Sequence, residues 1–450
     1  MITYQDLIAC GESEEARLEC IRKAMTDHKS SQQYRIAMDA DLYYMHQNPT
    51  IMKYEKVIYD MLGKIADPTA ANHKIASRFY FFFVTQLVQY LISNGVTFEN
   101  EATKEKIKNI DEALNKLCTY AQNHGVAYGF YNLDKLEVFS FLEFAPIFDE
   151  ENGSIRAGVR FWQIDSEKPL RITFYEEDGY TEYIQRKGED IEEYQPKKPY
   201  KLKIRTSEAT GTEIYDGENY PAFPVVPLYN INKQSELVGN QATIDAYDLV
   251  ASKMTNNVSE GDLIYWLIQN ADGMTPEDDQ KFLEMIHTQH LAHADEVQIE
   301  AKSIEIPHEA TDAALERLRK QLFDDFMAFD PAQISAGNVT ATQITAAYQQ
   351  LDNKADMFEY QIIEFILGIL NVAGIEDYPK FKRNRIANVA EETQVILSAA
   401  TVLDSDTIVE KLPFLTPEEA KQAKKRREDE EMQRYLTRPE DNEEITEGEE

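Results

Sequence analysis

The most regular hydrophobic pattern in the chain lies between residues 341 and 374. Apolar residues recur there at alternating steps of four and three, which places them on one face of an α-helix. They are Ile344, Tyr348, Leu351, Ala355, Phe358, Ile362, Phe365 and Ile369. The pattern continues to Gly374, a residue type that commonly ends helices. At 1.5 Å per residue, the predicted helix is about 50 Å long.

The preceding segment, residues 328–340, is mostly small and uncharged, and no Lys or Arg lies between 328 and 353. Two interpretations are open. The segment is either an ordinary loop before a long core helix or a mobile loop mounted on a rigid one.

Helical patterns also occur in the first quarter of the chain, at 11–27, 35–46, 71–93 and 102–123. The third should begin near Ala71 or Asn72 and end before Gly95. Its apolar face would bury Phe79, Phe82, Phe83, Leu87, Tyr90 and Leu91.

From residue 126 the hydrophobic period changes to two, which predicts strands. These strands cover 126–131, 136–141, 156–164, 170–175, 181–186 and 200–204. Residues 207–218 form a polar excursion, and Pro221, Pro224 and Pro227 then predict a stiff connector. Helices followed by an antiparallel sheet indicate an α+β fold that is mainly helical.

Helical patterns return from residue 239. We expect helices at 239–270, 276–293, 310–327, 388–400, from 405, and 417–435, with strands at 296–306 and 378–385. The last residues are mostly acidic and should be disordered.

Composition narrows the class of protein. The 450 residues carry a net charge of −34, which argues against tight wrapping of nucleic acid but allows a protein that DNA passes without sticking. Cys10, Cys20 and Cys118 form no disulfide framework or metal spacing, so a reducing compartment fits. The apolar stretch 79–92 is too short to span a bilayer. We therefore expect a soluble, cytosolic product that does not bind membranes.

No nucleotide-binding, zinc-protease or calcium-loop motif occurs. Their absence argues against a nucleotide-driven motor, and we expect no catalytic residue, metal or cofactor. One histidine set remains a candidate: His287, His290 and His293 recur every third residue. They are either exposed helix residues or a metal-binding or proton-sensitive contact.

Two charged sets lie within about a dozen residues of position 328. Asp324, Asp325 and Asp330 form either a solvated face or a carboxylate cluster for magnesium. The second set is Arg317, Arg319 and Lys320, an ordinary solvated face in a monomer and a basic belt in a ring.

The ordered set of several stretches resembles the portal proteins of tailed bacteriophages, in the group with a compact wing and a short clip. The stretches are 125–128, 144–149, 157–162, 224–230, 244–248 with Ser252, and, toward the C-terminus, Asn388, 391–398, 401–403, 412–413 and 417–419. The likeness covers about residues 30–430. No single motif among them is specific.

This resemblance implies a ring of identical subunits, usually twelve, at one capsid vertex, through which a separate terminase ATPase pumps double-stranded DNA. The implied parts are a wing (1–238), a first stem helix (239–266), a clip (267–308), a second stem helix (309–327), a tunnel loop (328–340), a long wing helix (341–374), a crown (375–435) and an acidic disordered tail (436–450). The clip would dock the terminase large subunit and later the head-completion connectors.

The chain departs from its relatives near the end of the predicted tunnel loop, where Ser335-Ala336-Gly337-Asn338 stands and no basic residue is present. We therefore predict steric and hydrogen-bonding contact with DNA by Gln333, Ser335, Asn338 and Thr340. Two other classes stay open, a metal-dependent nuclease or hydrolase and another oligomeric capsid adaptor.

Overall fold

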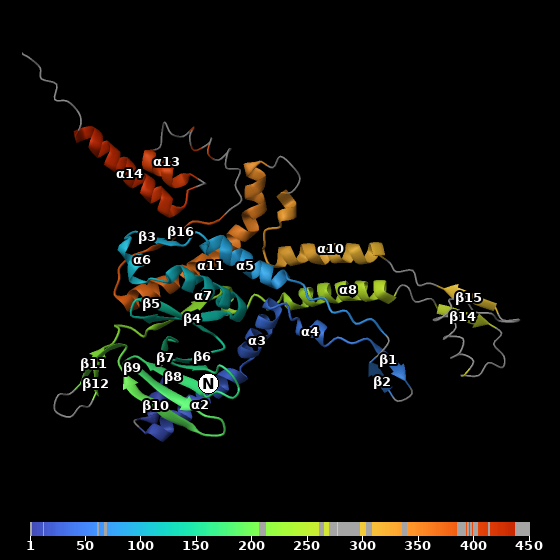
Figure 1. The fold of residues 1–450 in the computed structure, drawn as a ribbon, viewed down its shortest axis with the longest axis horizontal. Coiled ribbons are helices and arrows are strands. Elements are labelled where there is room, and N and C mark those ends of the chain that lie inside the picture. The colour runs from blue at the N-terminus through green and yellow to red at the C-terminus, as the bar shows by residue number, and fades with distance from the viewer. Residues whose placement is uncertain are drawn as a thin grey trace, which may run out of the picture. The chain divides into compact units, whose positions relative to one another are not determined.

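The computed structural model describes residues 2–11, 13–60, 63–66, 70–206, 213–260, 265–269, 277, 298–302, 308–334, 340–384, 393, 396, 398, 404–412 and 415–436. These residues form two compact units (Figure 1). The first unit comprises residues 1–44, 80–239 and 323–450, and the second comprises residues 45–79 and 240–322.

The first unit begins with helices and continues into sheets. Its N-terminal elements are α1 (Tyr4–Cys10), α2 (Glu14–Ser30), α3 (Gln32–Tyr44), α5 (Phe79–Ile92), β3 (Val96–Phe98), α6 (Ala102–Lys106) and α7 (Ile110–His124). Its C-terminal elements are η2 (Pro331–Ile334), α11 (Ala341–Ala373), β16 (Pro379–Phe381), α13 (Ser405–Lys411) and α14 (Pro417–Leu436). Strands β3 and β16 pair with each other.

Two antiparallel sheets make up most of the strand content of the first unit. One has the order β10-β9-β8-β7-β6 and the other the order β13-β4-β5. Their bounds are β4 (Val126–Asn132), β5 (Lys135–Ser140), β6 (Phe144–Phe148), β7 (Ile155–Trp162), β8 (Leu170–Glu176), β9 (Gly179–Gln185), β10 (Ile191–Lys198) and β13 (Val225–Tyr229). A separate ribbon pairs β11 (Lys201–Thr206) with β12 (Glu213–Glu218), and η1 (Ile231–Lys233) follows β13.

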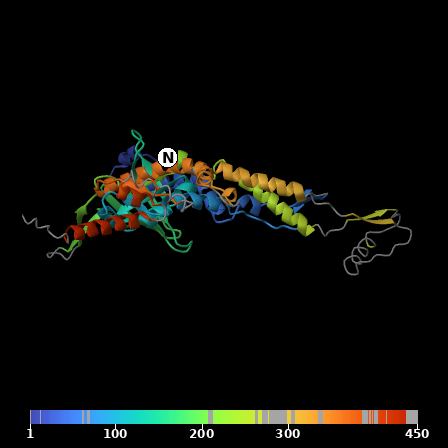
Figure 2. The same cartoon turned by 90° about the horizontal axis from the view of Figure 1, so that it is seen from above.

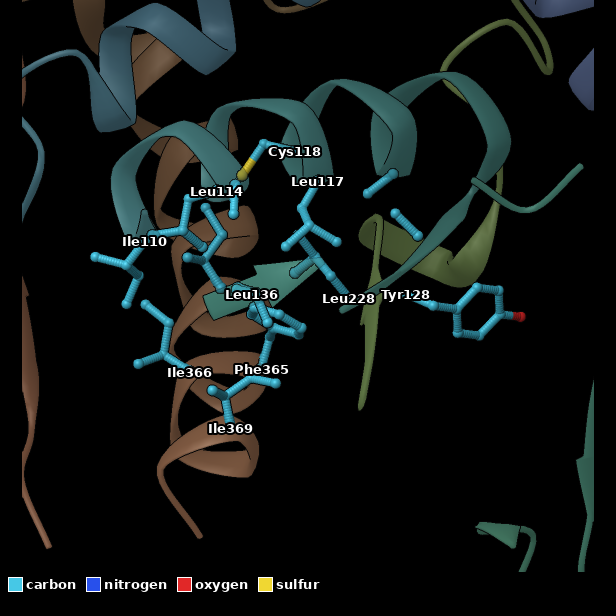
Figure 3. Packing of buried hydrophobic residues seen from close by; sticks show 14 of the residues in the cluster. Ile110, Leu114, Leu117, Cys118, Tyr128, Leu136, Leu228, Phe365, Ile366 and Ile369 are labelled. Carbon is cyan, nitrogen blue, oxygen red and sulfur yellow. The ribbon is translucent and has the colours of Figure 1, made fainter. Parts of the chain in front are cut away.

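The main core lies where α7 and α11 pack against the sheet β13-β4-β5 (Figure 3). Leu117, Leu136 and Phe365 are each at most 2% exposed. Gly129 on β4 has no side chain because the Phe365 ring occupies the space: a Cβ there would lie 2.5 Å from that ring. The long helix is therefore an integral part of the core.

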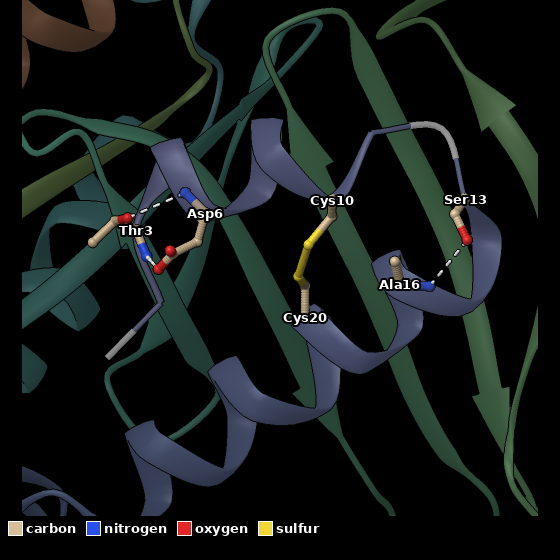
Figure 4. The surroundings of a disulfide bond; sticks show 6 residues. All are labelled: Thr3, Asp6, Cys10, Ser13, Ala16 and Cys20. Atoms are coloured by element: carbon tan, nitrogen blue, oxygen red, sulfur yellow. Dashed lines mark hydrogen bonds between the residues drawn. A yellow bond between two sulfur atoms is a disulfide. The ribbon is translucent and has the colours of Figure 1, made fainter.

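A second core lies on the five-stranded sheet, where α1 and α2 cover one face. Cys10 at the end of α1 and Cys20 on α2 are joined by a disulfide, with their Cα atoms 7.7 Å apart (Figure 4). The sequence predicted no disulfide framework, and this single pair does not amount to one. Cys118 is free and buried, and burial raises the pKa of its thiol.

The second unit contains α4 (Pro49–Met52), the ribbon β1 (Val57–Asp60) with β2 (Gly63–Ala66), α8 (Gln241–Glu260), and β14 (Tyr265–Gln269) paired with β15 (Gln298–Lys302). Helix α10 (His308–Asp325) starts in this unit and continues into the first. Both views show α8 and α10 side by side (Figures 1 and 2). Among the described residues, no helix combines the length and apolarity required to cross a bilayer.

Several predicted boundaries were wrong for local reasons. The helix expected at 102–123 is broken at Ile107, and the Lys108 amide instead donates to the Asp134 carbonyl. The Val225–Tyr229 stretch, expected to be a connector, is a strand, because Pro227 lies in an edge strand where its missing amide is tolerated. The polar excursion contains β12, and β6 and β10 were not expected as strands from hydrophobic period alone.

Candidate functional site

The predicted tunnel loop begins with three buried residues. Ala328, Phe329 and Asp330 are only 7%, 3% and 8% exposed. Helix α10 ends just before them with Met327 in the left-handed region, at φ 51°, and the Ala328 amide donates to the Phe323 carbonyl. The first residues of the segment are thus buried and hydrogen-bonded, as expected where an ordinary loop joins a core helix.

A buried lysine joins the end of α10 to α11. The Lys354 ammonium donates to the Phe326 carbonyl at 3.0 Å and to Glu236 Oε2 at 2.5 Å. The side chains of Lys354 and Glu236 are 8% and 13% exposed, so the ion pair is shielded from water. Sequence reasoning missed Lys354, because the composition of a helix does not reveal which of its lysines is buried.

The candidate DNA-contacting residues have different environments. The Thr340 hydroxyl accepts from the Gln343 amide, and Gln343 reaches back to the Thr340 amide, so this residue caps α11 in a capping box. Gln333 lies in η2. Ser335 and Asn338 lie outside the described residues.

An extended segment, residues 73–77, is bound along α8 in the second unit, and we call it the strap. The His73 amide donates to Asn256 Oδ1 at 2.7 Å, the Ile75 amide to Ser252 Oγ at 3.0 Å, and the Ser77 amide to Asp248 Oδ1 at 3.0 Å. The helix predicted from residue 71 therefore starts only at Phe79, since its intended first turn is hydrogen-bonded to α8 instead.

Asp248 is the most deeply buried member of this contact, at 0% exposed. It accepts from Asn48 Nδ2 at 2.8 Å, and the same nitrogen donates to Asp245 at 2.9 Å. Burial raises the pKa of Asp248, although its hydrogen bonds act in the opposite direction. Asp245, Asp248 and Ser252 belong to one of the stretches that carry the family resemblance. Asp248 and Ser252 accept hydrogen bonds from the strap, which gives a physical reason for a polar residue at these two positions.

The charged candidate sets do not converge. Arg317 and Lys320 are exposed on α10, and Arg319 is half-buried. Asp324 and Asp325 are exposed while Asp330 is buried, with its carboxylate accepting from the Ala332 amide. Across the described ranges, no group of three or more His, Cys, Asp or Glu side chains could hold a metal ion. His287, His290 and His293 lie outside the described residues.

The region predicted as the clip is described only at its base. Helix α8 ends at Glu260, earlier than the predicted 266, and Tyr265–Gln269 is a strand paired with Gln298–Lys302. The strand expected at 296–306 is confirmed in part by β15. The helix expected at 276–293 lies outside the described residues, apart from Glu277, which is helical.

The structure is α+β. Helices α8 and α10 lie side by side, the strand pair β14–β15 lies in the chain between them, and the capped 33-residue helix α11 follows a short segment. This is the order of parts that the resemblance to phage portals predicts. A family model described as phage portal protein, SPP1 Gp6-like, matches residues 23–433. The chain belongs to this family, and the resemblance inferred from the sequence is confirmed.

Two curated relatives match most of the chain. The portal protein of Bacillus phage SPP1 is 24% identical over 430 residues, covering 87% of this chain and 83% of the relative. The portal protein of Clostridium phage phiCD119 is 23% identical over 418 residues, covering 84% and 89%. Portal proteins are structural proteins that form rings at the neck of the virion, and their general function is DNA packaging.

Solved structures give weaker matches. A chain from the neck of a native GTA particle aligns with a TM-score of 0.42 and 12% identity, covering 76% of this chain and 91% of that one. An HK97 family phage portal protein from Corynebacterium diphtheriae aligns with a TM-score of 0.35 and 9% identity, covering 67% and 89%. The family assignment therefore rests on the sequence match.

Proposed function

We propose that this portal protein assembles in the host cytoplasm as a ring, with twelve copies as the expected number, and passes double-stranded DNA through its centre. The match of the family model to residues 23–433 is the observation that carries this proposal. The chain itself would be a passive conduit, while a terminase ATPase supplies the work. Electron microscopy of the purified full chain tests it: a ring with a central hole is expected, and a monodisperse monomer contradicts it.

In this ring, α8 and α10 would be the stem helices, and residues 267–308 the clip. The clip would dock the terminase large subunit during packaging and the head-completion connectors afterwards, with His287, His290 and His293 at the contact. Other parts of the ring would meet the major capsid and scaffolding proteins. Replacing the three histidines with Ala should weaken terminase binding to assembled rings, and unchanged binding would remove them from the contact.

Residues 328–340 would contact DNA without an electrostatic grip, since they contain no basic residue. Gln333, Ser335, Asn338 and Thr340 would provide hydrogen bonds that form and break as the duplex passes. A quadruple variant should carry Gln333→Ala, Ser335→Ala, Asn338→Ala and Thr340→Ser, because Ser keeps the cap of α11. Packaging and retention of DNA should fall relative to Thr340→Ser alone; unchanged values would contradict the contact.

The net charge of −34 supports weak, transient and non-specific DNA binding, because an acidic wall repels phosphates. Arg317, Arg319 and Lys320 would then form a narrow basic belt in the stem. Changing all three to Glu should alter the packaging rate or its salt dependence. The matched control makes the same charge change at Lys424, Lys425 and Arg426 on α14, and equal effects of both triples would remove the belt.

The alternative of a metal-dependent nuclease needs ligands that converge. A purified ring that cleaves DNA with magnesium, and loses cleavage in Asp324→Ala, would support that alternative instead. A capsid adaptor is disfavoured because the family match extends over nearly the whole chain.

A further inference from the structure

Gln86 on α5 pairs with the backbone of Phe329 as a neighbouring strand would. Its side-chain amide donates from Nε2 to the Phe329 carbonyl at 2.8 Å, and its Oε1 accepts from the Phe329 amide at 3.0 Å. Both backbone groups of this one residue are therefore satisfied by one side chain, which lies 243 positions away along the chain. A two-bond contact of this kind fixes the orientation of the peptide as well as its position.

The Phe329 side chain is held separately by a stack of three rings. Its ring lies parallel to Tyr348 on α11, with centroids 4.1 Å apart and an interplanar angle of 7°. Tyr348 in turn stacks on Tyr90 of α5 at 5.7 Å and 20°. The Tyr90 hydroxyl donates to Asp352, one helical turn beyond Tyr348, which ties the stack to α11 a second time.

Ordinary core packing would account for the ring stack but not for the amide pairing. A buried apolar residue needs a cavity of the right shape, which any of several neighbours could supply. The Gln86 contact recognises the main chain of one residue, and that residue stands at the start of the segment proposed to meet DNA. Helices α5 and α11, which are far apart in sequence, converge on this residue.

We propose that Phe329 is a fixed anchor and that Gln86 and Tyr348 are positioning residues, which set where the DNA-contacting segment leaves the wing. The inference rests on the proposed function of residues 328–340 and extends it: helix α5, and not only α11, determines the position of that segment. Removing the contacts that hold Phe329 changes the packaging or retention of DNA, while the ring itself still forms.

The anchor is tested first by hydrogen exchange at the Phe329 amide in assembled rings. Gln86→Met keeps the length of the side chain and removes both hydrogen bonds, so this amide should exchange roughly 5 to 30 times faster. Gln89→Met, at an exposed position on the same helix, should leave exchange unchanged. An unchanged Phe329 exchange rate in Gln86→Met overturns the anchor.

The positioning role is tested by DNA packaging into proheads that contain variant rings. Gln86→Met and Tyr348→Leu should both slow packaging or release packaged DNA, with rings of normal size by electron microscopy. Ile366→Val, a core change on α11 away from Phe329, controls for lost stability and should package normally. If Gln86→Met fails to assemble, Tyr348→Leu carries the same test.

The outcomes separate the inference from the proposed function. Faster exchange with slower packaging supports the positioning role. Faster exchange with normal packaging overturns it. In that case, a defect in the quadruple variant of residues 333–340 would show that the segment still contacts DNA and that only the anchor is dispensable.

Discussion

Helices α8 and α11 were predicted from the same kind of apolar spacing, yet they bury different chemistry. On α11, the predicted stripe is buried almost as expected, with Phe358, Phe365 and Ile369 at most 1% exposed. On α8, Asp248 and Ser252 are 0% and 2% exposed, while the apolar residue Val258 is 54% exposed. The buried face of α11 is therefore mostly apolar, whereas the buried face of α8 also includes polar residues that accept hydrogen bonds from an extended backbone.

Amphipathic spacing therefore identifies a helix, but it does not show which residues on that helix are buried. Helix α11 packs on a sheet whose own backbone groups are already paired, so the face of α11 that meets this sheet needs no hydrogen-bonding side chains. The strap has no sheet partner for its amides, and a buried amide without an acceptor is costly. Polar residues on α8 supply the acceptors.

Removing apolar area from α11 should have the largest effect. Phe365→Ala is expected to lower the free energy of unfolding of the first unit by about 3–5 kcal/mol, because the ring is buried and leaves a cavity beside Gly129. Thermal unfolding measures the loss. Leu367→Ala, at an exposed position on the same helix, should cost under about 1 kcal/mol. Similar losses for both variants would mean that burial of the Phe365 ring does not stabilise the first unit.

Acid should destabilise the first unit. His28 is buried, and burial lowers the pKa of its imidazole to about 4, although its bond to the Phe141 carbonyl opposes this. Since the unfolded value is near 6.5, the unfolded chain binds a proton first. Stability contributed by neutral His28 is present above pH 6.5 and is lost as pH falls toward 4, by about 3 kcal/mol in all.

The measurement is the melting temperature of the first unit between pH 7 and pH 4. His28→Gln keeps a donor for the Phe141 carbonyl and does not titrate, so its melting temperature should fall less across this range. An identical pH profile for the two proteins would rule out His28 as the source.

Asn48→Asp should loosen the second unit while sparing the first. Aspartate keeps the acceptor that caps α4 at Thr50, but it loses the amide that donates to Asp245 and Asp248. It also adds a third carboxylate, so we expect a cost of roughly 2 kcal/mol. Hydrogen exchange should accelerate at the Ser77 amide. Unchanged exchange there would show that Asn48 does not support the strap.

The smallest predicted effect comes from a single bond of the strap. Ser252→Ala removes the acceptor of the Ile75 amide and should cost about 1 kcal/mol, with faster exchange at that amide. Ser259→Ala, exposed on the same helix, serves as the control. If both variants behave alike, the strap is held by something other than the polar residues of α8.

Local patterns predicted much of the first unit. Helices α2 and α3 and the strands β4, β5, β7, β8 and β9 match their predicted positions within a few residues, because their hydrophobic period follows directly from their backbone geometry. The helix expected at 417–435 is confirmed as α14, and the Thr416 hydroxyl before it accepts from the Glu419 amide. The family was recognisable from the order of short stretches.

The sequence by itself thus determined the α+β class, the long helix, its end at Gly374 and the family. Only the tertiary structure decided which residues of the candidate site are held and by what. Gln86 and Phe329, Lys354 and Glu236, and Asp248 and Ser77 are each separated by more than 100 residues. Hydrophobic period describes neighbours a turn apart, whereas a hydrogen bond between distant residues depends on how the whole chain packs.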